Sequence, residues 1–264
     1  MTDGLLTYHL HEDIVAFTTD RTIGRDPDKV RHAVCQQFQP TADGAGICPE
    51  DELRFARPHQ THTDRIMLIA EEYFSLTPQS QQLLMEGIDA VMTNLPRVIL
   101  GVSTADCIPI LVYDPQHHAA AAIHAGWRGT VQRIVQKTLA QMACCYHTDP
   151  ALCRAQIGPG ISMDSFEVGD EVYEAFAQAG FDMTAIATRY PLSTAEATTP
   201  QRPWKWHIDL KEANRHQLLA AGLPADSIAV SPIDTFTDTR FFSARREQKG
   251  DIKCGRIFSG FVMR

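Results

Sequence analysis

The sequence of 264 residues contains no apolar run long enough to cross a membrane. Its longest candidates, residues 98–102 and 108–112, are the length of β-strands, whereas a membrane helix needs about 20 apolar residues. The first residues also lack the basic head, the long apolar segment and the small-residue cleavage site that direct secretion. These absences predict a cytoplasmic protein with no membrane partner.

Cations are fewer than anions, since 24 Lys and Arg side chains stand against 32 Asp and Glu, and the formal net charge is -8. A surface for a nucleic-acid polymer needs clustered cations that face the phosphates. The charge balance therefore argues against such a partner, although it allows a local cationic pocket. A hydrophobic content of 44% is sufficient for a full core. The composition carries no indication of the oligomeric state.

Disulfide and metal-knot patterns are also missing. The chain has seven cysteines, and no two of them form a C-x-x-C pair. An odd number without that spacing suits neither a disulfide framework nor a four-cysteine zinc site, so buried thiols are the default expectation. Cys144 and Cys145 are adjacent, and a bridge between neighbours is strained. We expect these two thiols to be inert.

Short apolar strands alternate with amphipathic helices, without an internal repeat. Apolar runs bounded by Asp, Pro and Gly predict strands at residues 13–19, 65–70, 88–92, 97–103, 107–113, 119–123 and 154–157. The turn at Asp114-Pro115 predicts a hairpin between two of these strands. Helical spacing and end signals predict helices that begin at Asp26 and Gly126, and helices over residues 169–179 and 209–221.

The helix after Gly126 shows the clearest apolar stripe, at residues 127, 131, 134, 135, 139 and 142. Residues 184–203, with their Thr, Ala and Pro content, predict a long surface loop. The pattern as a whole predicts one α/β or α+β domain over residues 1–264. In that domain helices flank a mixed sheet that contains hairpins.

Three side chains with metal-binding chemistry lie at the ends of predicted strands. His62 precedes the strand at 65–70, Cys107 begins an apolar strand, and His124 follows the strand at 119–123. Such junctions let side chains of neighbouring strands converge on one cleft. Two imidazoles and a thiolate suit zinc, and three protein ligands leave a fourth position open. The alternative is a packed Cys107 thiol beside two hydrogen-bonded loop histidines.

Other histidines are weaker candidates. His59 lies three residues before His62 in a predicted loop, so we expect only one of the two to point inward. His117 and His118 fall on the predicted hairpin turn and are expected to be solvated. Residues 9–11 form the only H-x-H pair, whereas an ordinary multicopper oxidase needs several.

Two segments have the composition of anion sites. Glycines flank Trp127 and Arg128 at a predicted helix start, where backbone N–H groups attract anions. The alternative there is a tight turn in which Arg128 meets an acidic neighbour. Residues 240–246 place aromatic rings beside three arginines, an arrangement that can stack a base and hold a phosphate. The alternative is a strand with solvated arginines.

Several motifs together resemble one family in order and spacing. They are Gln60-Thr61-His62-Thr63, Thr104-Ala105-Asp106-Cys107, His124-Ala125-Gly126-Trp127-Arg128-Gly129, Gly158-Pro159-Gly160 and Phe242-Ser243-Ala244-Arg245-Arg246. The chain resembles the YfiH-like family, also described as the laccase-domain or polyphenol oxidoreductase family, from about residue 13 to its end. It departs from the family pattern at residues 60–63, where Gln-Val-His-Gly is frequent.

The resemblance implies a single domain with an α/β/β/α-like layered fold and a zinc ion held by His62, Cys107 and His124. It also implies a purine nucleoside phosphorylase. Adenosine, inosine, guanosine or methylthioadenosine would react with phosphate to give the base and a ribose 1-phosphate. Adenosine deamination is a related activity of the family.

Roles for individual residues follow as hypotheses. Cys107 and His124 would act with the metal, and Asp106 would be an acid/base or an orienting residue. Gln60 and Arg21 would contact the substrate, and Arg128 or Arg245 would clamp an anion. Three alternatives stay open: a metal-free cysteine hydrolase that uses Cys107 and His124, a copper-dependent polyphenol oxidoreductase, and a non-catalytic binding module.

Overall fold

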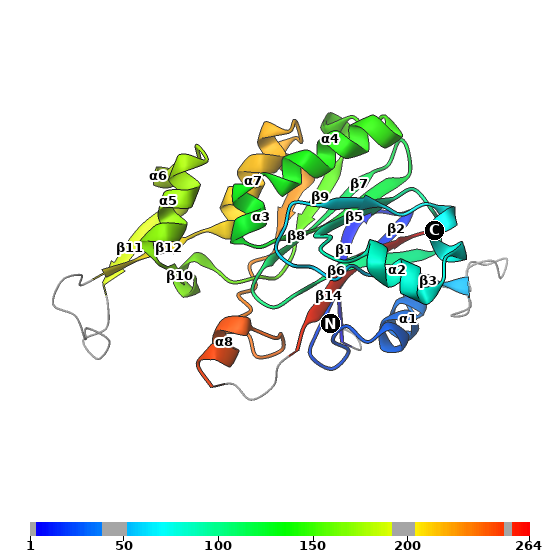
Figure 1. Cartoon of the computed structure of the whole chain (residues 1–264), viewed down its shortest axis with the longest axis horizontal. Helices are drawn as coiled ribbons and strands as arrows, with labels where there is room; N and C mark the ends of the chain where they lie inside the picture. Colours follow the sequence, from blue (N-terminus) through cyan, green and yellow to red (C-terminus); the bar gives the residue numbers. More distant parts are fainter. Residues whose placement is uncertain (1–3, 39–51, 192–203, 251–254) are drawn as a thin grey trace.

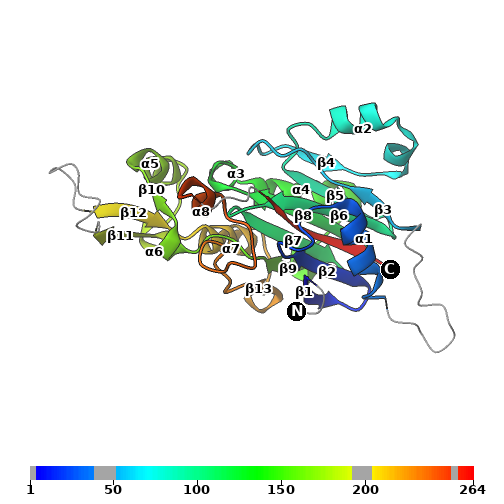
Figure 2. The same cartoon turned by 90° about the horizontal axis from the view of Figure 1, so that it is seen from below.

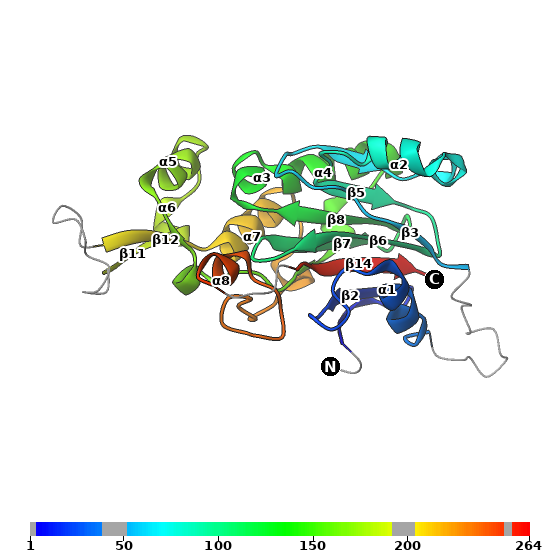
Figure 3. The same cartoon turned by 60° about the horizontal axis from the view of Figure 1, so that its bottom comes forward.

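The computed structural model describes residues 4–38, 52–191, 204–250 and 255–264. A five-stranded sheet has the strand order β1-β2-β14-β6-β3, and all neighbours are antiparallel except β3 and β6. Its strands are β1 (Leu5–His11), β2 (Ile14–Thr19), β3 (Arg54–Ala56), β6 (Val98–Thr104) and β14 (Ile257–Met263). Figure 3 shows β14, in red, running beside β2.

A six-stranded sheet has the order β13-β9-β7-β8-β5-β4, with parallel pairs at its two edges. Its strands are β4 (Ile66–Leu68), β5 (Ala90–Thr93), β7 (Ile108–Asp114), β8 (Ala119–Ala125), β9 (Arg154–Ile157) and β13 (Ile228–Val230). The strands β7 and β8 form the predicted hairpin. A small antiparallel sheet contains β10 (Glu167–Val168), β11 (Ala187–Pro191) and β12 (Trp204–Ile208). It lies at one end of the molecule (Figure 2).

The two large sheets pack face to face through one apolar layer. Leu100 and Phe261 of the five-stranded sheet belong to the same buried cluster as Leu111 and Ala122 of the six-stranded sheet. Every residue of β6, β7, β8 and β14 is buried, because these strands are covered on both faces. Such strands appear in the sequence as continuous apolar runs.

Helices cover the two outer faces (Figure 1). α1 (Pro27–Cys35) packs Val30 and Val34 in one cluster with Phe17 and Phe258 of the five-stranded sheet. α4 (Ile134–Tyr146) and α7 (Leu210–Ala220) cover the six-stranded sheet. The mixed α/β class and the α/β/β/α layering are therefore confirmed. The other helices are α2 (Pro78–Leu84), α3 (Trp127–Val131), α5 (Asp170–Gln178), α6 (Met183–Ile186) and α8 (Ala244–Gln248).

The prediction of one helix after Gly126 is wrong. α3 ends at Val131 and α4 begins at Ile134, because Arg133 adopts a left-handed conformation with φ 63°. The side chain of Arg133 donates to the carbonyl of Ala179 over 2.7 Å and lies over the ring of Phe181. These contacts with residues distant in sequence stabilise the break between α3 and α4. The apolar spacing of residues 127–142 cannot predict them.

The predicted surface loop at residues 184–203 is wrong in its first part, where most of α6 and the whole of β11 lie. β11 pairs with β12, so its stability depends on a partner further along the chain. Residues 192–203 lie outside the described residues. The strands predicted from the sequence also did not include β1, β3, β10, β12, β13 and β14.

The cysteines differ in exposure. Cys153 is buried as expected, but Cys144 and Cys145 are exposed in the last turns of α4, so the expectation of buried thiols is wrong for this pair. The five cysteines in the described segments are free thiols. Cys48 and Cys254 lie outside those segments.

Within the described residues, none of the helices has the length and apolar character that a bilayer crossing requires.

Candidate active site

His62, Cys107 and His124 converge at one end of the six-stranded sheet. Their ligand atoms all lie within 4.8 Å of one another, and His62 Nε2 is 3.7 Å from Cys107 Sγ. Cys107 directly precedes β7 and His124 lies in β8, its partner in the hairpin. His62 comes from the loop before β4. No second group of three such ligands exists among the residues that the structure describes.

The distance between His62 Nε2 and Cys107 Sγ fits two ligands of one metal ion. Tetrahedral bonds of about 2.0–2.3 Å to zinc separate ligand atoms by about 3.3–3.6 Å, close to the distance between His62 and Cys107. Gly126 permits this approach, since a Cβ there would lie 3.0 Å from Cys107 Sγ and from His62 Cδ2. Two imidazoles and a thiolate form a borderline-soft donor set, which suits zinc and also binds copper.

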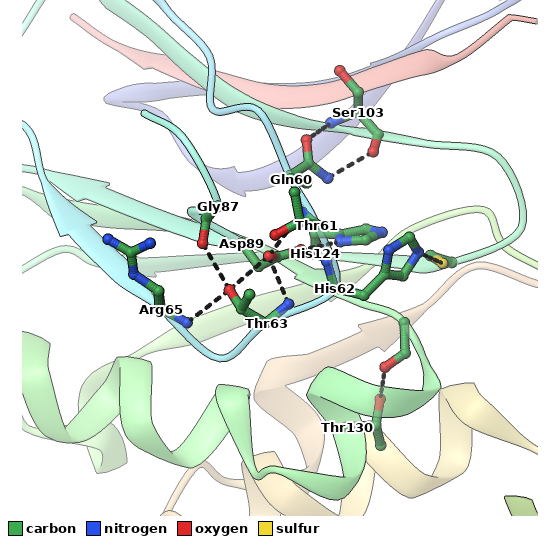
Figure 4. A network of polar contacts seen from close by, with 12 residues as sticks. Gln60, Thr61, His62, Thr63, Arg65, Gly87, Asp89, Ser103, His124 and Thr130 are labelled. Carbon is green, nitrogen blue, oxygen red and sulfur yellow. Dashed lines mark hydrogen bonds and ion pairs between the residues drawn. The ribbon is translucent and has the colours of Figure 1, made fainter. Parts of the chain in front are cut away.

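A buried carboxylate that the sequence analysis missed joins the two histidines. Asp89 is fully buried and directly precedes β5. Its Oδ1 atom lies 2.6 Å from His124 Nδ1 and accepts a hydrogen bond from the backbone N–H of His62. Figure 4 shows Asp89 beside His124 and the loop that carries His62. The one available signal was a charged residue inside a predicted apolar strand at 88–92.

The pKa values of these groups depend on one another. Burial opposes ionisation of Cys107, but the charge of His124 and hydrogen bonds with both histidines lower the pKa of the thiol to about 6. Burial likewise opposes protonation of His124, but the Cys107 thiolate and Asp89 raise its pKa to about 9. Hydrogen bonds with His124 and Thr63 lower the pKa of Asp89 to about 2 despite its burial. The site therefore favours the thiolate, the form of cysteine that binds metals.

The three ligands open onto a cavity of about 890 Å³. Among the residues that the structure describes, its wall contains five cationic side chains and two carboxylates, Asp26 and Asp106. Asp26 caps α1 and accepts from two backbone N–H groups there. The cavity is thus locally cationic within an acidic protein, as the sequence allowed. The cations are Arg21, Arg25, Lys29, Arg245 and Arg256.

Asp106 binds the C-terminal segment rather than an open space. Its two oxygens accept from Thr235 Oγ1 over 2.7 Å, from Ser243 Oγ over 3.0 Å and from the backbone N–H of Arg245 over 2.6 Å. Asp106 is buried and left-handed, with φ 83°. Asp106 therefore connects the chain just before Cys107 to the first turn of α8, which contains Arg245.

Gln60 lines the cavity, but its amide group is already paired. Its Nε2 atom donates to the Ser103 carbonyl and its Oε1 atom accepts from the Ser103 N–H, both over 2.8 Å. The pairing attaches the His62 loop to β6. His59 contacts Glu86 over 2.8 Å and also lines the cavity. Of this histidine pair only His62 belongs to the ligand group.

The predicted arginines divide into two groups. Arg21 and Arg245 line the cavity, each near an aromatic ring: Arg21 lies over Phe242 and Arg245 lies over Phe166. Arg128 is exposed, lies over the Trp127 ring and does not line this cavity. The structure therefore brings Arg21 and Arg245 to the site and leaves Arg128 outside it.

The segment at residues 240–246 forms neither of the two predicted arrangements completely. Residues 240–243 form no strand, and α8 begins at Ala244. Arg246 donates to the carbonyls of Thr235, Phe236 and Phe241. Arg246 therefore stabilises the loop before α8, whereas Phe242 and Arg245 line the cavity.

Comparison with known proteins identifies the family. A family model described as multi-copper polyphenol oxidoreductase laccase matches residues 22–264. The chain belongs to this laccase-domain family. The crystal structure of the hypothetical protein YfiH from Bacillus licheniformis superposes with a TM-score of 0.77. The match covers 100% of this chain and 97% of that chain at 23% identity, which supports the fold.

Two relatives of this laccase-domain chain have named activities. A purine nucleoside phosphorylase of Bacteroides thetaiotaomicron is 47% identical over 222 residues, which cover 84% of this chain and 76% of the relative. The adenosine deaminase RL5 of an unknown prokaryotic organism is 43% identical over 204 residues, which cover 77% and 72%. The chain is thus a homologue of enzymes that act on purine nucleosides.

Proposed function

We propose that the protein is a zinc-dependent purine nucleoside phosphorylase. The observation that carries the proposal is the His62, Cys107 and His124 group at the wall of a cavity to which the described residues contribute five cations. Homology to the phosphorylase of Bacteroides thetaiotaomicron supports it. The substrates would be phosphate and adenosine, inosine, guanosine or methylthioadenosine, and the products the base and a ribose 1-phosphate.

The reaction transfers a ribosyl group from nitrogen to oxygen. A phosphate oxygen forms a bond to ribose C1′, and the bond between C1′ and the purine N9 breaks with its electron pair going to the base, which takes up a proton. Bound zinc would supply a positive charge for the phosphate or the leaving group. Arg245 would hold the phosphate, because it lines the cavity and its guanidinium is fixed on the Glu167 carbonyl over 2.9 Å.

The purine nucleoside needs flat apolar surfaces on which the base can stack and polar groups held in fixed positions. Phe166 and Phe242 line the cavity, and each offers a ring on which a base can stack. Arg21 lies 5.0 Å from the centre of the Phe242 ring and would contact the ribose or the phosphate. The three hydrogen bonds that Asp106 accepts support the orienting role predicted for it. Gln60 would act on the substrate through the position of the His62 loop.

Adenosine deamination is a second candidate activity, favoured by the similarity to the adenosine deaminase RL5. The reaction replaces the C6 amino group of adenine with an oxygen from water and releases ammonia. Three protein ligands with an open fourth position are the arrangement in which zinc activates water. The same cavity would then bind adenosine in the absence of phosphate.

A metal-free cysteine hydrolase is the main chemical alternative, because a thiol with a lowered pKa beside a histidine is also a nucleophile. Copper chemistry of the multicopper kind would need more ligand groups than the single one found in the described parts of the chain. A non-catalytic binding module would show no turnover with any purine nucleoside. Metal content and products together separate these alternatives.

The test combines mass-spectrometric metal analysis of the native protein with chromatography of the products from adenosine and phosphate. We expect about one zinc ion per chain, together with adenine and ribose 1-phosphate. Cys107→Ala should lose both zinc and phosphorolysis by at least about 100-fold. Cys144→Ala is the matched control, because that thiol is exposed and lies outside the ligand group.

The outcomes are distinct. Retention of zinc and phosphorolysis by Cys107→Ala would contradict the proposal. Full activity of the metal-stripped protein that thiol alkylation abolishes would favour the cysteine hydrolase instead. Inosine and ammonia formed from adenosine without phosphate would assign the deamination.

A further inference from the structure

One buried carboxylate contacts both histidines of the ligand group. We propose that Asp89 is the positioning residue of the metal site: it fixes the orientation of His124 and the backbone conformation that presents His62. The inference rests on the metal site proposed above. Asp89 has no exposed surface, so it contacts neither solvent nor substrate and acts only through the two histidines.

The first contact concerns His124. Its Nδ1 atom lies 2.6 Å from Asp89 Oδ1, and a carboxylate oxygen can only accept in such a contact. Nδ1 therefore carries the proton, and Nε2 is left free as the ligand atom. The rings of His62 and His124 meet edge to face, with centroids 5.0 Å apart. Rotation of the His124 ring would consequently disturb His62 as well.

The second set of contacts concerns the His62 loop. The carboxylate accepts from the backbone N–H groups of Thr61, His62 and Thr63 over 2.8–3.2 Å, and from the Thr63 hydroxyl over 2.8 Å. His62 adopts a left-handed conformation with φ 65°, which is unfavourable for a residue with a side chain. The three converging N–H groups stabilise that conformation. Figure 4 shows this loop wrapped around Asp89.

An amide cannot replace this carboxylate. Oδ1 accepts from the two histidines, and Oδ2 accepts from Thr61 and Thr63. Asparagine has only one accepting oxygen, so in either orientation its NH₂ group would face donors. Asp89→Asn preserves the volume of the side chain but loses one half of the network. Either the His124 tautomer or the loop is then released.

The experiment measures metal affinity directly, with cobalt(II) and zinc(II) as probes. Cobalt bound to a thiolate has a charge-transfer absorption band and visible d–d bands that report tetrahedral geometry. We expect Asp89→Asn to weaken the affinity for both metals by about 10–100-fold and to alter the cobalt bands. Nucleoside turnover is not needed as a readout, so the result is independent of the reaction proposed above.

Asp114→Asn is the matched control. Asp114 is equally buried and also contacts a histidine, with Oδ2 lying 2.9 Å from His117 Nδ1. It accepts from the backbone N–H groups of Gln116 and His117 as well. The two variants therefore lose comparable networks, but only one network contacts the ligand group. The metal affinity of Asp114→Asn should equal that of the wild type.

Each outcome decides the proposal. Wild-type affinity and cobalt spectra in Asp89→Asn would overturn the role of Asp89 while leaving the metal site intact. A wild-type protein that binds neither metal would overturn the metal site and this inference together. If Asp89→Asn does not fold, ¹⁵N NMR of the zinc-loaded wild type decides instead. Zinc on His124 Nε2 with a proton on Nδ1 is expected, and zinc on Nδ1 would overturn the inference.

Discussion

At the scale of a single residue, Gly126 leaves the space that Cys107 and His62 of the proposed ligand group occupy. Its φ of -70° is accessible to any residue, so the need for glycine here comes from space and not from backbone strain. An added Cβ would lie 3.0 Å from atoms of both Cys107 and His62. The absence of a side chain at Gly126 thus determines how closely Cys107 and His62 can approach each other.

Gly126→Ala should therefore weaken metal binding more than it weakens the fold. The methyl group would move His62 or Cys107 by a few tenths of an ångström, which disturbs a tetrahedral site with tolerances of about 0.2 Å. We expect a several-fold lower zinc affinity in a chelator competition. The unfolding free energy of the metal-free variant should stay within about 1 kcal/mol of the wild type. Unchanged zinc affinity would show that the side chains adapt without cost.

The boundary between α3 and α4 is decided at the scale of the element. Arg133 adopts left-handed φ and ψ angles in the middle of a sequence whose apolar spacing fits one helix. For an L-amino acid this conformation costs roughly 1–2 kcal/mol. The contacts of its guanidinium with Ala179 and Phe181 offset that cost.

A pair of substitutions separates these two effects. Arg133→Ala loses the side-chain contacts and keeps the backbone strain, whereas Arg133→Gly loses the contacts and relieves the strain. We expect Arg133→Gly to be more stable than Arg133→Ala by about 1 kcal/mol in urea unfolding. A continuous helix would give the opposite order, because glycine is the poorer helix former.

The turn between β7 and β8 depends on a buried charge. Burial raises the pKa of Asp114, but hydrogen bonds with neighbouring side chains and with the backbone N–H groups of His117 and Gln116 outweigh it and lower the pKa. A carboxyl group with a lowered pKa stabilises the fold above its unfolded pKa of about 3.9. That contribution is lost as the pH falls through the folded pKa.

Asp114→Asn should consequently lower the unfolding free energy by about 1–2 kcal/mol at neutral pH. The difference from the wild type should shrink below about pH 4, where the wild-type carboxyl group also becomes protonated. Denaturant unfolding at several pH values measures both quantities. A difference that stays constant down to about pH 3 would mean that the charge of Asp114 does not contribute.

Charge is distributed unevenly at the scale of the whole molecule. The formal net charge is -8. In contrast, five cations and two carboxylates from the described segments line the cavity, and both carboxylates already accept hydrogen bonds from other groups of the protein. An acidic protein repels anions at long range, so a phosphate co-substrate would be attracted only close to the cavity. Salt screens such exposed charges.

The Michaelis constant for phosphate should therefore respond to ionic strength. Raising NaCl from about 50 mM to about 500 mM shortens the screening length from about 14 Å to about 4 Å. We expect the KM for phosphate to rise several-fold, while kcat with saturating phosphate changes little. Initial-rate kinetics with adenosine at saturation give both values. A constant KM would indicate that the cationic wall does not bind the phosphate.

Local pattern was enough to predict a substantial part of this protein. Strands covered on both faces produce apolar runs, and end signals marked α1, α5 and α7 closely. His62, Cys107 and His124 were placed at strand ends from the order of residues alone. Their types and positions limited the chemistry to a few classes, and among these the family resemblance favours the metal site that we propose.

Contacts between distant residues decided the rest. β14 lies between β2 and β6 although more than 150 residues of chain separate it from β6, and Asp106 accepts from Ser243, 137 positions away. Neither pairing leaves a local pattern, because both depend on how the sheets pack. Asp89 is the clearest case at the site: its sequence neighbours show only a charge in an apolar strand. Its function as a link between His62 and His124 exists only when the loop folds around it.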